Sequence, residues 1–222
     1  MNRIELFEAL SGCPTVRRFK RNSVDDAKVA AVLQAANYAP SGGNSQPWDF
    51  ILIRETEAKR KIGAYATSGL ETLRRVGALS PLDPDQRKAL QRAAALARET
   101  DQVPFLILVC LDVRRALKET RLKRREILKS LSKLPQLRRI RDLTLYGSMF
   151  PAVQNLILAA RGLGLGTCIS LAPLVFEGEM KQLFGIPKSI RLVALLYMGY
   201  PHGRFITPKR LPVERFIHRE KW

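Results

Sequence analysis

The chain has 222 residues, of which 46% are hydrophobic and 26% are charged, as in an ordinary globular protein. No apolar run reaches the ~18–20 residues of a membrane-spanning helix, and the first residues lack the basic head and apolar stretch of a secretory signal. Three dispersed cysteines and two histidines argue against a disulfide framework and against a metal site. We therefore expect a cytoplasmic protein that binds no metal.

Hydrophobic periodicity and turn residues predict helices with strands between them. Ser23, followed by two acids, is typical of a helix N-cap, and Pro40 marks the end of that helix. An apolar run such as 104–111 is typical of a central strand. Four or five strands among helices, followed by an extended basic tail, indicate one α+β domain over residues 1–222. In chain order we expect helices at 23–39, 56–66, 83–98, 114–133 and 147–163, and strands at 50–53, 104–111, 168–170 and 192–198.

The net charge of +18 is concentrated in residues 114–141, here called the basic segment. It holds twelve lysines and arginines against two glutamates, a net charge of +10. The simplest interpretation is a solvated amphipathic helix, ended by Pro135. Contact with nucleic acid or with an anionic membrane is an alternative that we do not favour, because the segment contains no aromatic residue for base stacking.

Residues 39–48, APSGGNSQPW, form a segment that we call the polar loop. Its glycines allow backbone N–H groups to approach a ligand, and its serine, asparagine and glutamine side chains can donate and accept hydrogen bonds. A flat heterocyclic ligand has alternating hydrogen-bond donors and acceptors along its edge and needs such a mixture of groups. The alternative is a turn between helix and strand that binds no ligand, because such a turn has the same composition. No P-loop motif occurs, and the glycine-rich stretch 162–166 follows a predicted helix, so it is not a dinucleotide fingerprint.

Three blocks resemble the FMN-dependent nitroreductase family, in the family's order and spacing. The first is 16–19 (VRRF) followed by the polar loop. The second, 146–160 (YGSMFPAVQNLILAA) with the exit 162–166, resembles the family's dimer helix. The third, 198–201 (MGYP) with the C-terminal arm 203–222, resembles its last strand and tail. Together the blocks span nearly the whole chain.

The resemblance implies an α+β sandwich with a mostly antiparallel central sheet, an intertwined homodimer, and FMN sites at the subunit interface. The phosphate and ribityl chain would lie near Thr15 and Arg17, and the tail would bring Lys209 and Arg210 to the phosphate. Arginine suits this role because it binds phosphate through bidentate, charge-assisted hydrogen bonds. The polar loop of the other subunit would line the isoalloxazine ring. The implied FMN-binding residues are Thr15, Arg17, Pro40, Ser41, Gly42, Asn44, Gln46, Lys209 and Arg210.

The activity that the resemblance implies is that of an FMN-dependent NAD(P)H oxidoreductase. In the family's ping-pong cycle, NADH or NADPH delivers a hydride to flavin N5, and a small electron-poor acceptor such as a nitroaromatic or a quinone then takes it. No catalytic side chain is required. The alternatives in the same fold are reductive dehalogenation, azoline oxidation and flavin fragmentation. A different class is a non-catalytic protein that binds partners through its basic face.

Two stretches depart from the family pattern. Cys13 stands where typical members have the first arginine of an Arg-Arg-Ser-x-Arg motif, so one or two phosphate contacts are missing. Nearby Arg18, Lys20 and Arg204 are candidates to compensate. Residues 169–172 replace a Pro-x-Glu-Gly stretch that covers the ring in many members. The basic segment has no assigned family role; as an alternative to a solvated helix, it could border the active site and favour the NADPH 2′-phosphate.

Several bulky side chains receive structural interpretations. We expect Trp48 to pack behind the polar loop rather than to stack on the flavin. Along the implied dimer helix, Phe150, Val153, Leu156 and Ile157 are expected to form the core between subunits.

Overall fold

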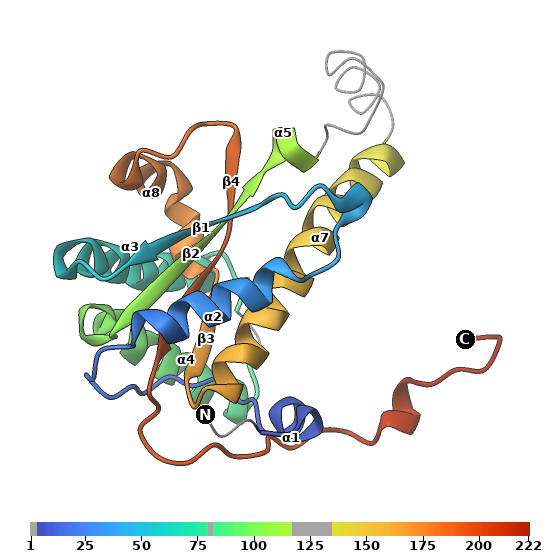
Figure 1. Ribbon diagram of the computed structural model, residues 1–222, viewed down its shortest axis with the longest axis horizontal. Helices are drawn as coiled ribbons and strands as arrows, with labels where there is room; N and C mark the ends of the chain where they lie inside the picture. The colour runs from blue at the N-terminus through green and yellow to red at the C-terminus, as the bar shows by residue number, and fades with distance from the viewer. Residues whose placement is uncertain (1–3, 80–81, 117–134) are drawn as a thin grey trace.

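The computed structural model describes residues 4–79, 82–116 and 135–222, which are arranged around one sheet (Figure 1). The sheet has four antiparallel strands in the order β1-β2-β4-β3. The predicted α+β class is confirmed, and each strand lies within two residues of its predicted bounds. The strands are β1 (Trp48–Ile53), β2 (Phe105–Asp112), β3 (Gly166–Ser170) and β4 (Ile190–Gly199).

The two middle strands, β2 and β4, are buried on both faces of the sheet. In β2, Phe105 and Ile107 belong to one hydrophobic core, whereas Leu106 and Leu108 belong to the core on the opposite face. Every residue of β2 is buried, and in β4 only Arg191 is partly exposed. Because side chains on both faces are removed from water, these strands are continuous apolar runs in the sequence instead of alternating patterns.

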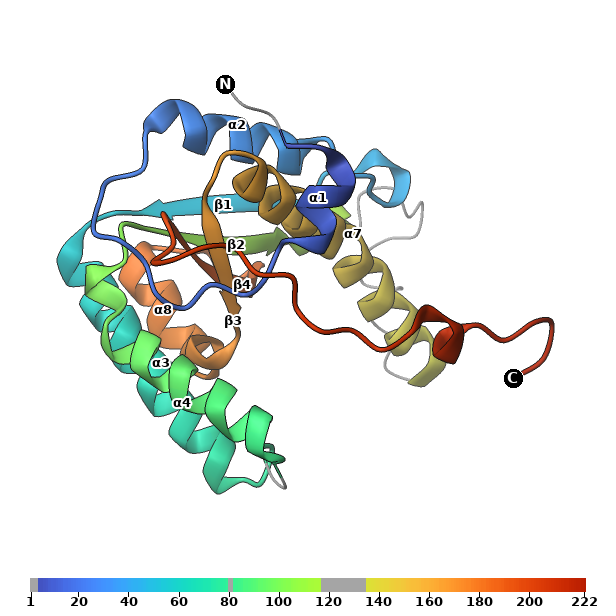
Figure 2. The same cartoon turned by 90° about the horizontal axis from the view of Figure 1, so that it is seen from below.

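Helices cover both faces of the sheet (Figure 2). Two helices, α2 (Asp26–Asn37) and α7 (Pro135–Gly162), pack on one face. The opposite face is covered by α3 (Thr56–Arg75), α4 (Pro84–Arg98) and α8 (Glu177–Phe184). The shorter elements are α1 (Leu6–Ser11), α5 (Val113–Ala116) and the 3-10 turns η1 (Gly42–Asn44), η2 (Thr100–Gln102), η3 (Ala172–Phe176) and η4 (Val213–Phe216).

The predicted start of α2 is wrong. Ser23 is not the N-cap of α2, because the Asp25 side chain accepts a hydrogen bond from the Ala27 N–H at 2.8 Å and fills that role. Pro135 is the first residue of α7 within the described part of the chain, and the first helical position needs no N–H partner. The predicted helix at 114–133 lies mostly outside the described residues.

The predicted end of α3 and the predicted start of α7 are also wrong, since α3 ends later and α7 begins earlier than expected. Helix α3 continues through Gly69 to Arg75. Gly69 lowers the intrinsic helix propensity there, but it lets α3 approach the backbone of η3, where an added Cβ would overlap the Ala172 carbonyl group. Tertiary packing therefore outweighs the local preference against glycine.

Helix α7 is a core helix of the chain itself. Val153 and Leu156 are 1% and 0% exposed within the core under the sheet, so their expected place between subunits is wrong. Ile157 packs against the same core. Within the described part of the chain, Arg138–Gly162 is the one helical stretch long and apolar enough to be a weak membrane-span candidate, with a mean hydropathy of 1.2. Part of its apolar surface is buried in the core beside the sheet.

The predicted extended tail, residues 203–222, is confirmed. Phe205 holds its beginning to the body, since the Arg161 guanidinium lies 4.1 Å from the centre of the Phe205 ring. Beyond this contact the tail runs away from the body, with one turn at η4 (Figure 2).

The close approach of α3 to η3 predicts the effect of a single methyl group. We expect Gly69→Ala to lower the free energy of unfolding by about 1–3 kcal/mol, because neither backbone can move aside easily. The matched control is Gly178→Ala in α8, where a Cβ meets open space and should stabilise the helix by up to about 1 kcal/mol. Urea denaturation of both variants checks this, and equal midpoints for the two would contradict the packing argument.

Candidate functional site

Residues 15–20 run along the ends of the last two strands of the sheet. The Val16 N–H donates to the Thr167 carbonyl oxygen at 2.8 Å, and Thr15 pairs with Thr167 in a parallel bridge. This approach requires glycine at position 166, where a Cβ would lie 2.6 Å from a methyl group of Val16. The backbone contacts therefore fix the segment that carries the two residues expected to meet the FMN phosphate.

A pocket of about 600 Å³ opens beside this segment. Thr15 and Arg17 both line it, so the structure brings together these two residues from the sequence prediction. Of the three candidates to compensate for Cys13, Arg18 and Arg204 line the pocket, but Lys20 does not. The volume is in the range of small-ligand sites and is large enough for a phosphate with part of its chain.

Arg17 carries an unsatisfied hydrogen-bond donor. Its Nε is buried and has no partner among the described residues. Its positive charge also reaches the neighbouring Cys168: burial raises the pKa of the Cys168 thiol to about 11, while Arg17 acts in the opposite direction. A buried donor without an acceptor costs about 1–3 kcal/mol, so a ligand that accepts this hydrogen bond would be favoured. The pocket therefore fits an anionic group.

The structure does not bring Lys209 and Arg210 to this pocket. Both are exposed on the tail, and the hydrogen bond recorded for the Arg210 side chain goes to the Lys209 carbonyl oxygen at 3.4 Å. Arg204 lies at the beginning of the tail and is the tail arginine that lines the pocket.

The polar loop holds three residues in the left-handed region of backbone conformation. Gly43, Asn44 and Gln46 have φ of 54°, 52° and 44°. This region is uncommon for residues other than glycine, and it persists only where the surroundings hold it. Pro40 stands exposed at the beginning of the loop.

Side-chain hydrogen bonds hold this conformation. The Gln46 N–H donates to Ser41 Oγ at 3.0 Å, and the Gly42 N–H donates to Ser148 Oγ on α7 at 3.1 Å. The Gln46 side-chain amide donates to Asn44 Oδ1 at 3.1 Å. The loop is thus tied both to itself and to the middle of α7.

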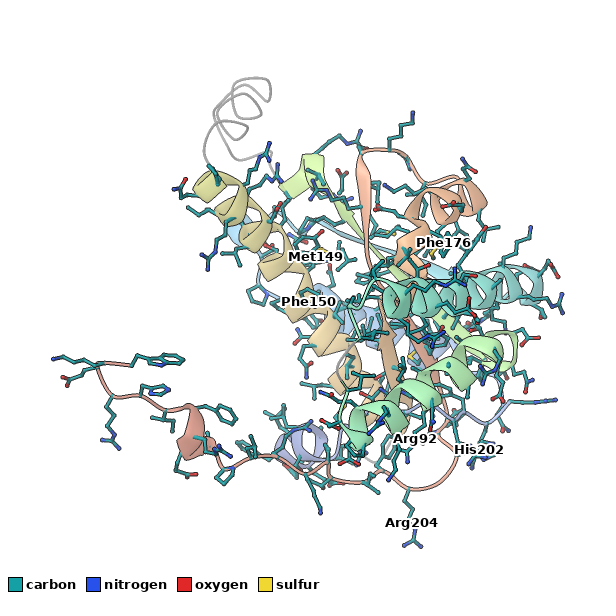
Figure 3. All side chains as sticks on the ribbon, turned by 180° about the vertical axis from the view of Figure 1, so that it is seen from behind. Arg92, Met149, Phe150, Phe176, His202 and Arg204 are labelled. Atoms are coloured by element: carbon teal, nitrogen blue, oxygen red, sulfur yellow. The ribbon has the colours of Figure 1, made fainter. Side chains whose placement is uncertain are left out.

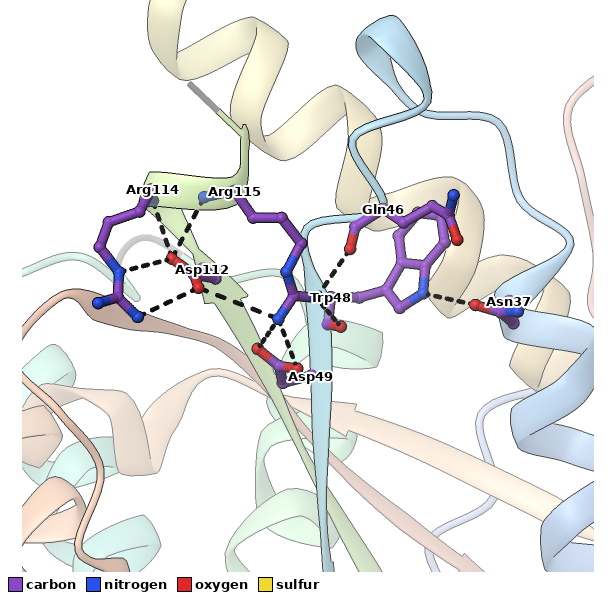
Figure 4. A network of polar contacts seen from close by, with 7 residues as sticks. All are labelled: Asn37, Gln46, Trp48, Asp49, Asp112, Arg114 and Arg115. Atoms are coloured by element: carbon purple, nitrogen blue, oxygen red, sulfur yellow. Dashed lines mark hydrogen bonds and ion pairs between the residues drawn. The ribbon is translucent and has the colours of Figure 1, made fainter. Parts of the chain in front are cut away.

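Arg115 clamps the end of the polar loop (Figure 4). Its Nη1 donates to the carbonyl oxygens of Gln46 and Trp48 at 2.9 and 3.1 Å, and its Nη2 lies 3.0 Å from both carboxylate oxygens of Asp49. Trp48 is 6% exposed, and its Nε1 donates to Asn37 Oδ1 at 3.1 Å. Trp48 therefore packs behind the loop, as predicted.

Asp112 connects this clamp to β2. Burial raises the pKa of the Asp112 carboxyl, but hydrogen bonds from Arg114 and Arg115 outweigh it, so that the pKa lies below its ordinary value. The first two arginines of the basic segment are therefore paired with acids of the chain itself. Residues 117–134 of that segment lie outside the described part of the structure.

The polar loop and the segment 15–20, which lines the pocket with Arg17, lie at different ends of the molecule (Figure 1). The loop rests on α7 at Ser148, whereas the pocket adjoins β3, which follows the end of α7 at Gly162. The intervening fourteen residues of helix span about 20 Å. One chain therefore does not unite the two halves of the expected site.

Sequence reasoning missed two residues of these half-sites, Arg115 and Arg92. In the sequence Arg115 is one of many basic residues in the basic segment. Its partners Gln46 and Asp49 are distant in sequence, so no local pattern could identify its role in holding the polar loop. Arg92 lines the pocket from α4, but a surface arginine on a polar helix face carries no signal of its own.

Comparisons with known proteins place the chain in a family. A protein of Archaeoglobus fulgidus, named as a candidate NADH dehydrogenase/NAD(P)H nitroreductase, is 28% identical over 214 residues, which cover 94% of this chain and 93% of that one. An iodotyrosine deiodinase of Thermotoga neapolitana is 27% identical over 197 residues and covers 88% of each chain. The solved NADPH:FMN oxidoreductase of Vibrio harveyi, complexed with NAD+, has a TM-score of 0.68 at 16% identity and covers 98% of this chain and 77% of that one. Because the model of the Nitroreductase family also matches residues 14–200, the chain belongs to the Nitroreductase family.

Proposed function

We propose that the protein is an FMN-dependent NAD(P)H oxidoreductase. The observation that carries the proposal is the pocket beside the N-terminal segment, where the buried Arg17 Nε has no acceptor in the described part of the chain and Thr15 offers a hydroxyl group. A phosphate group supplies several acceptor oxygens and two negative charges to such a site. Membership of the Nitroreductase family and the names of the relatives support the same conclusion.

The polar loop offers hydrogen-bond donors for the other end of the cofactor. Asn44 Oδ1 accepts from Gln46, which leaves the Asn44 Nδ2 group as a donor. The Ser41 Oγ accepts from the Gln46 N–H, which leaves the Ser41 hydroxyl hydrogen free to donate. Donors beside the N1–C2=O edge of a flavin favour its reduced form. We therefore assign Pro40, Ser41, Gly42, Asn44 and Gln46 to the ring end of the site.

A second copy of the chain is needed to unite the two half-sites. Helix α7 presents Ile140, Leu143 and Phe150 to solvent at helical spacing, with exposed fractions of 58%, 62% and 45%. An exposed apolar stripe of this kind is typical of a protein interface. We infer a homodimer in which the loop of one chain meets the pocket of the other. The tail, free beyond Phe205, would then bring Lys209 and Arg210 to the phosphate.

The side chains bind and orient, and no acid, base or nucleophile is required of them. When bound, FMN would supply hydride transfer between NAD(P)H and an electron-poor acceptor. Thr15 and Arg17 hold the phosphate end, and the loop fixes the position of the ring end. We propose the acceptor only as a class, a small nitroaromatic or quinone. Similarity does not select one acceptor, because the deiodinase relative and the candidate nitroreductase are almost equally identical to this chain.

The proposal is tested by the visible absorption spectrum of the purified protein. We expect a flavin band that bleaches when NADH or NADPH is added without oxygen, because the bound cofactor then accepts a hydride. A protein that is colourless, and that takes up no added FMN, would favour the non-catalytic alternative instead.

The clamp on the polar loop predicts a positioning role for Arg115. Arg115→Ala removes all its hydrogen bonds to the loop, so we expect the dissociation constants of FMN and riboflavin to rise together, by about tenfold. Arg114→Ala is the matched control, because Arg114 pairs with Asp112 and has no recorded bond to the loop. Fluorescence titration of the flavin-free protein measures both constants. Unchanged affinities in Arg115→Ala would contradict the role.

The apolar stripe on α7 predicts an effect on assembly. We expect Phe150→Asp to shift the protein from dimer to monomer and to lower its flavin content, because a carboxylate cannot be buried unpaired in an apolar interface. Val76→Asp, at an exposed apolar residue after α3, is the control. Light scattering after size-exclusion chromatography gives the molar mass. A Phe150→Asp protein that stays dimeric would place the interface elsewhere.

A further inference from the structure

The side chain at position 13 contributes no charge to the phosphate pocket. Cys13 does not line the pocket, and its Sγ lies 4.0 Å from the Ile157 carbonyl oxygen on α7. Burial raises the pKa of its thiol, and the charge of Arg161 acts in the opposite direction. Arg161 is itself engaged, since its Nε donates to the Gly12 carbonyl oxygen at 2.7 Å and its guanidinium covers the Phe205 ring. In the family motif an arginine at this position supplies a positive charge to the phosphate. In this chain another residue would have to supply that charge.

Arg92 offers a guanidinium from the facing helix. It lies on α4 and lines the same pocket as Thr15 and Arg17, which both come from the N-terminal segment 15–20. Its side chain is exposed and makes no recorded hydrogen bond or ion pair within the described residues. Figure 3 shows Arg92 on the helix and Arg204 at the rim, with the Arg204 side chain extending away from the body. Arg92 is therefore better placed than Arg204 to face a ligand in the pocket.

The electrostatics of the pocket require side-chain cations. Two lining residues, Ala95 and Glu99, lie in the last turn and at the C-cap of α4, where the helix dipole is negative and disfavours an anion. No helix N-terminus among the pocket's lining residues offers free N–H groups. Four arginines against Glu99 give the lining a formal charge of +3. An anion in this pocket is thus held mainly by guanidinium groups.

We propose that Arg92 is a phosphate-binding residue of the FMN site and supplies from α4 the charge that position 13 lacks. This inference rests on the proposed function. Arg17 approaches the pocket from the N-terminal segment and Arg92 from α4, so the phosphate would be held between two separate elements. Because Arg92 lines the pocket with Thr15 and Arg17, which we assign to the phosphate end of the site, it would recognise the phosphate and not the ring.

The test compares FMN with riboflavin, which has the same ring but no phosphate. Flavin-free full-length protein is titrated with each flavin, and flavin fluorescence gives the dissociation constants. We expect Arg92→Ala to weaken FMN binding about tenfold or more, the effect of losing a charge-assisted hydrogen bond. Its riboflavin affinity should stay within about twofold of that of the wild type, because no ligand charge is involved. Arg92→Lys keeps the charge without the bidentate geometry and should lie between the two.

Arg87→Ala is the matched control, since Arg87 is exposed on the same helix but does not line the pocket. Wild-type affinity for FMN in Arg92→Ala would overturn the inference and leave the proposed function intact. Equal weakening of FMN and riboflavin would also overturn it, because it would indicate a structural role. Failure of the wild-type protein to bind either flavin would overturn the proposed function and this inference together.

Discussion

Strands β2 and β4 pair antiparallel from Phe105 with Met198 to Asp112 with Ile190, and neither strand exposes a face to water. A polar group placed in the middle of these strands would lose its hydrogen bonds to solvent without gaining others. The chain therefore places its polar and charged groups at the rim of the sheet. The polar loop lies before β1, residues 15–20 adjoin the ends of β3 and β4, and the tail leaves after β4.

Arginines at this rim play two different physical roles. Arg115 is saturated: it donates to two carbonyl oxygens and pairs with Asp49, so it fixes a loop conformation that the backbone alone disfavours. Arg17 is the opposite case, because its buried Nε has no acceptor among the described residues. A satisfied arginine stabilises the protein, whereas an unsatisfied one favours a ligand. Net charge alone, even a value of +18, does not distinguish these roles.

The sequence predicts those features that depend on local pattern. The apolar run in β2 identified a central strand, and the helix predicted at 83–98 from its apolar and polar sides agrees with α4, whose start the structure shows to be a capping box of Asp83 with Gln86. The same reasoning failed at Ser23, where the neighbouring Asp25 is the cap instead. It also failed where distant contacts decide, as at Gly69, whose role depends on η3. The pairing of Arg115 with Asp49 joins distant segments, so only the fold could show it.

The division of the candidate site between two ends of one chain has a thermodynamic consequence. A pocket with an unsatisfied Arg17 donor is less stable alone than with a ligand that accepts its hydrogen bond. If one cofactor bridges the two half-sites across a dimer, linkage requires that it bind more tightly to the dimer than to either chain alone. Assembly would then stabilise the bound cofactor, and the cofactor would stabilise the assembly by the same free energy. The apolar stripe of α7 and the arginines of the pocket, which have no contact with each other, would in this way act on one equilibrium.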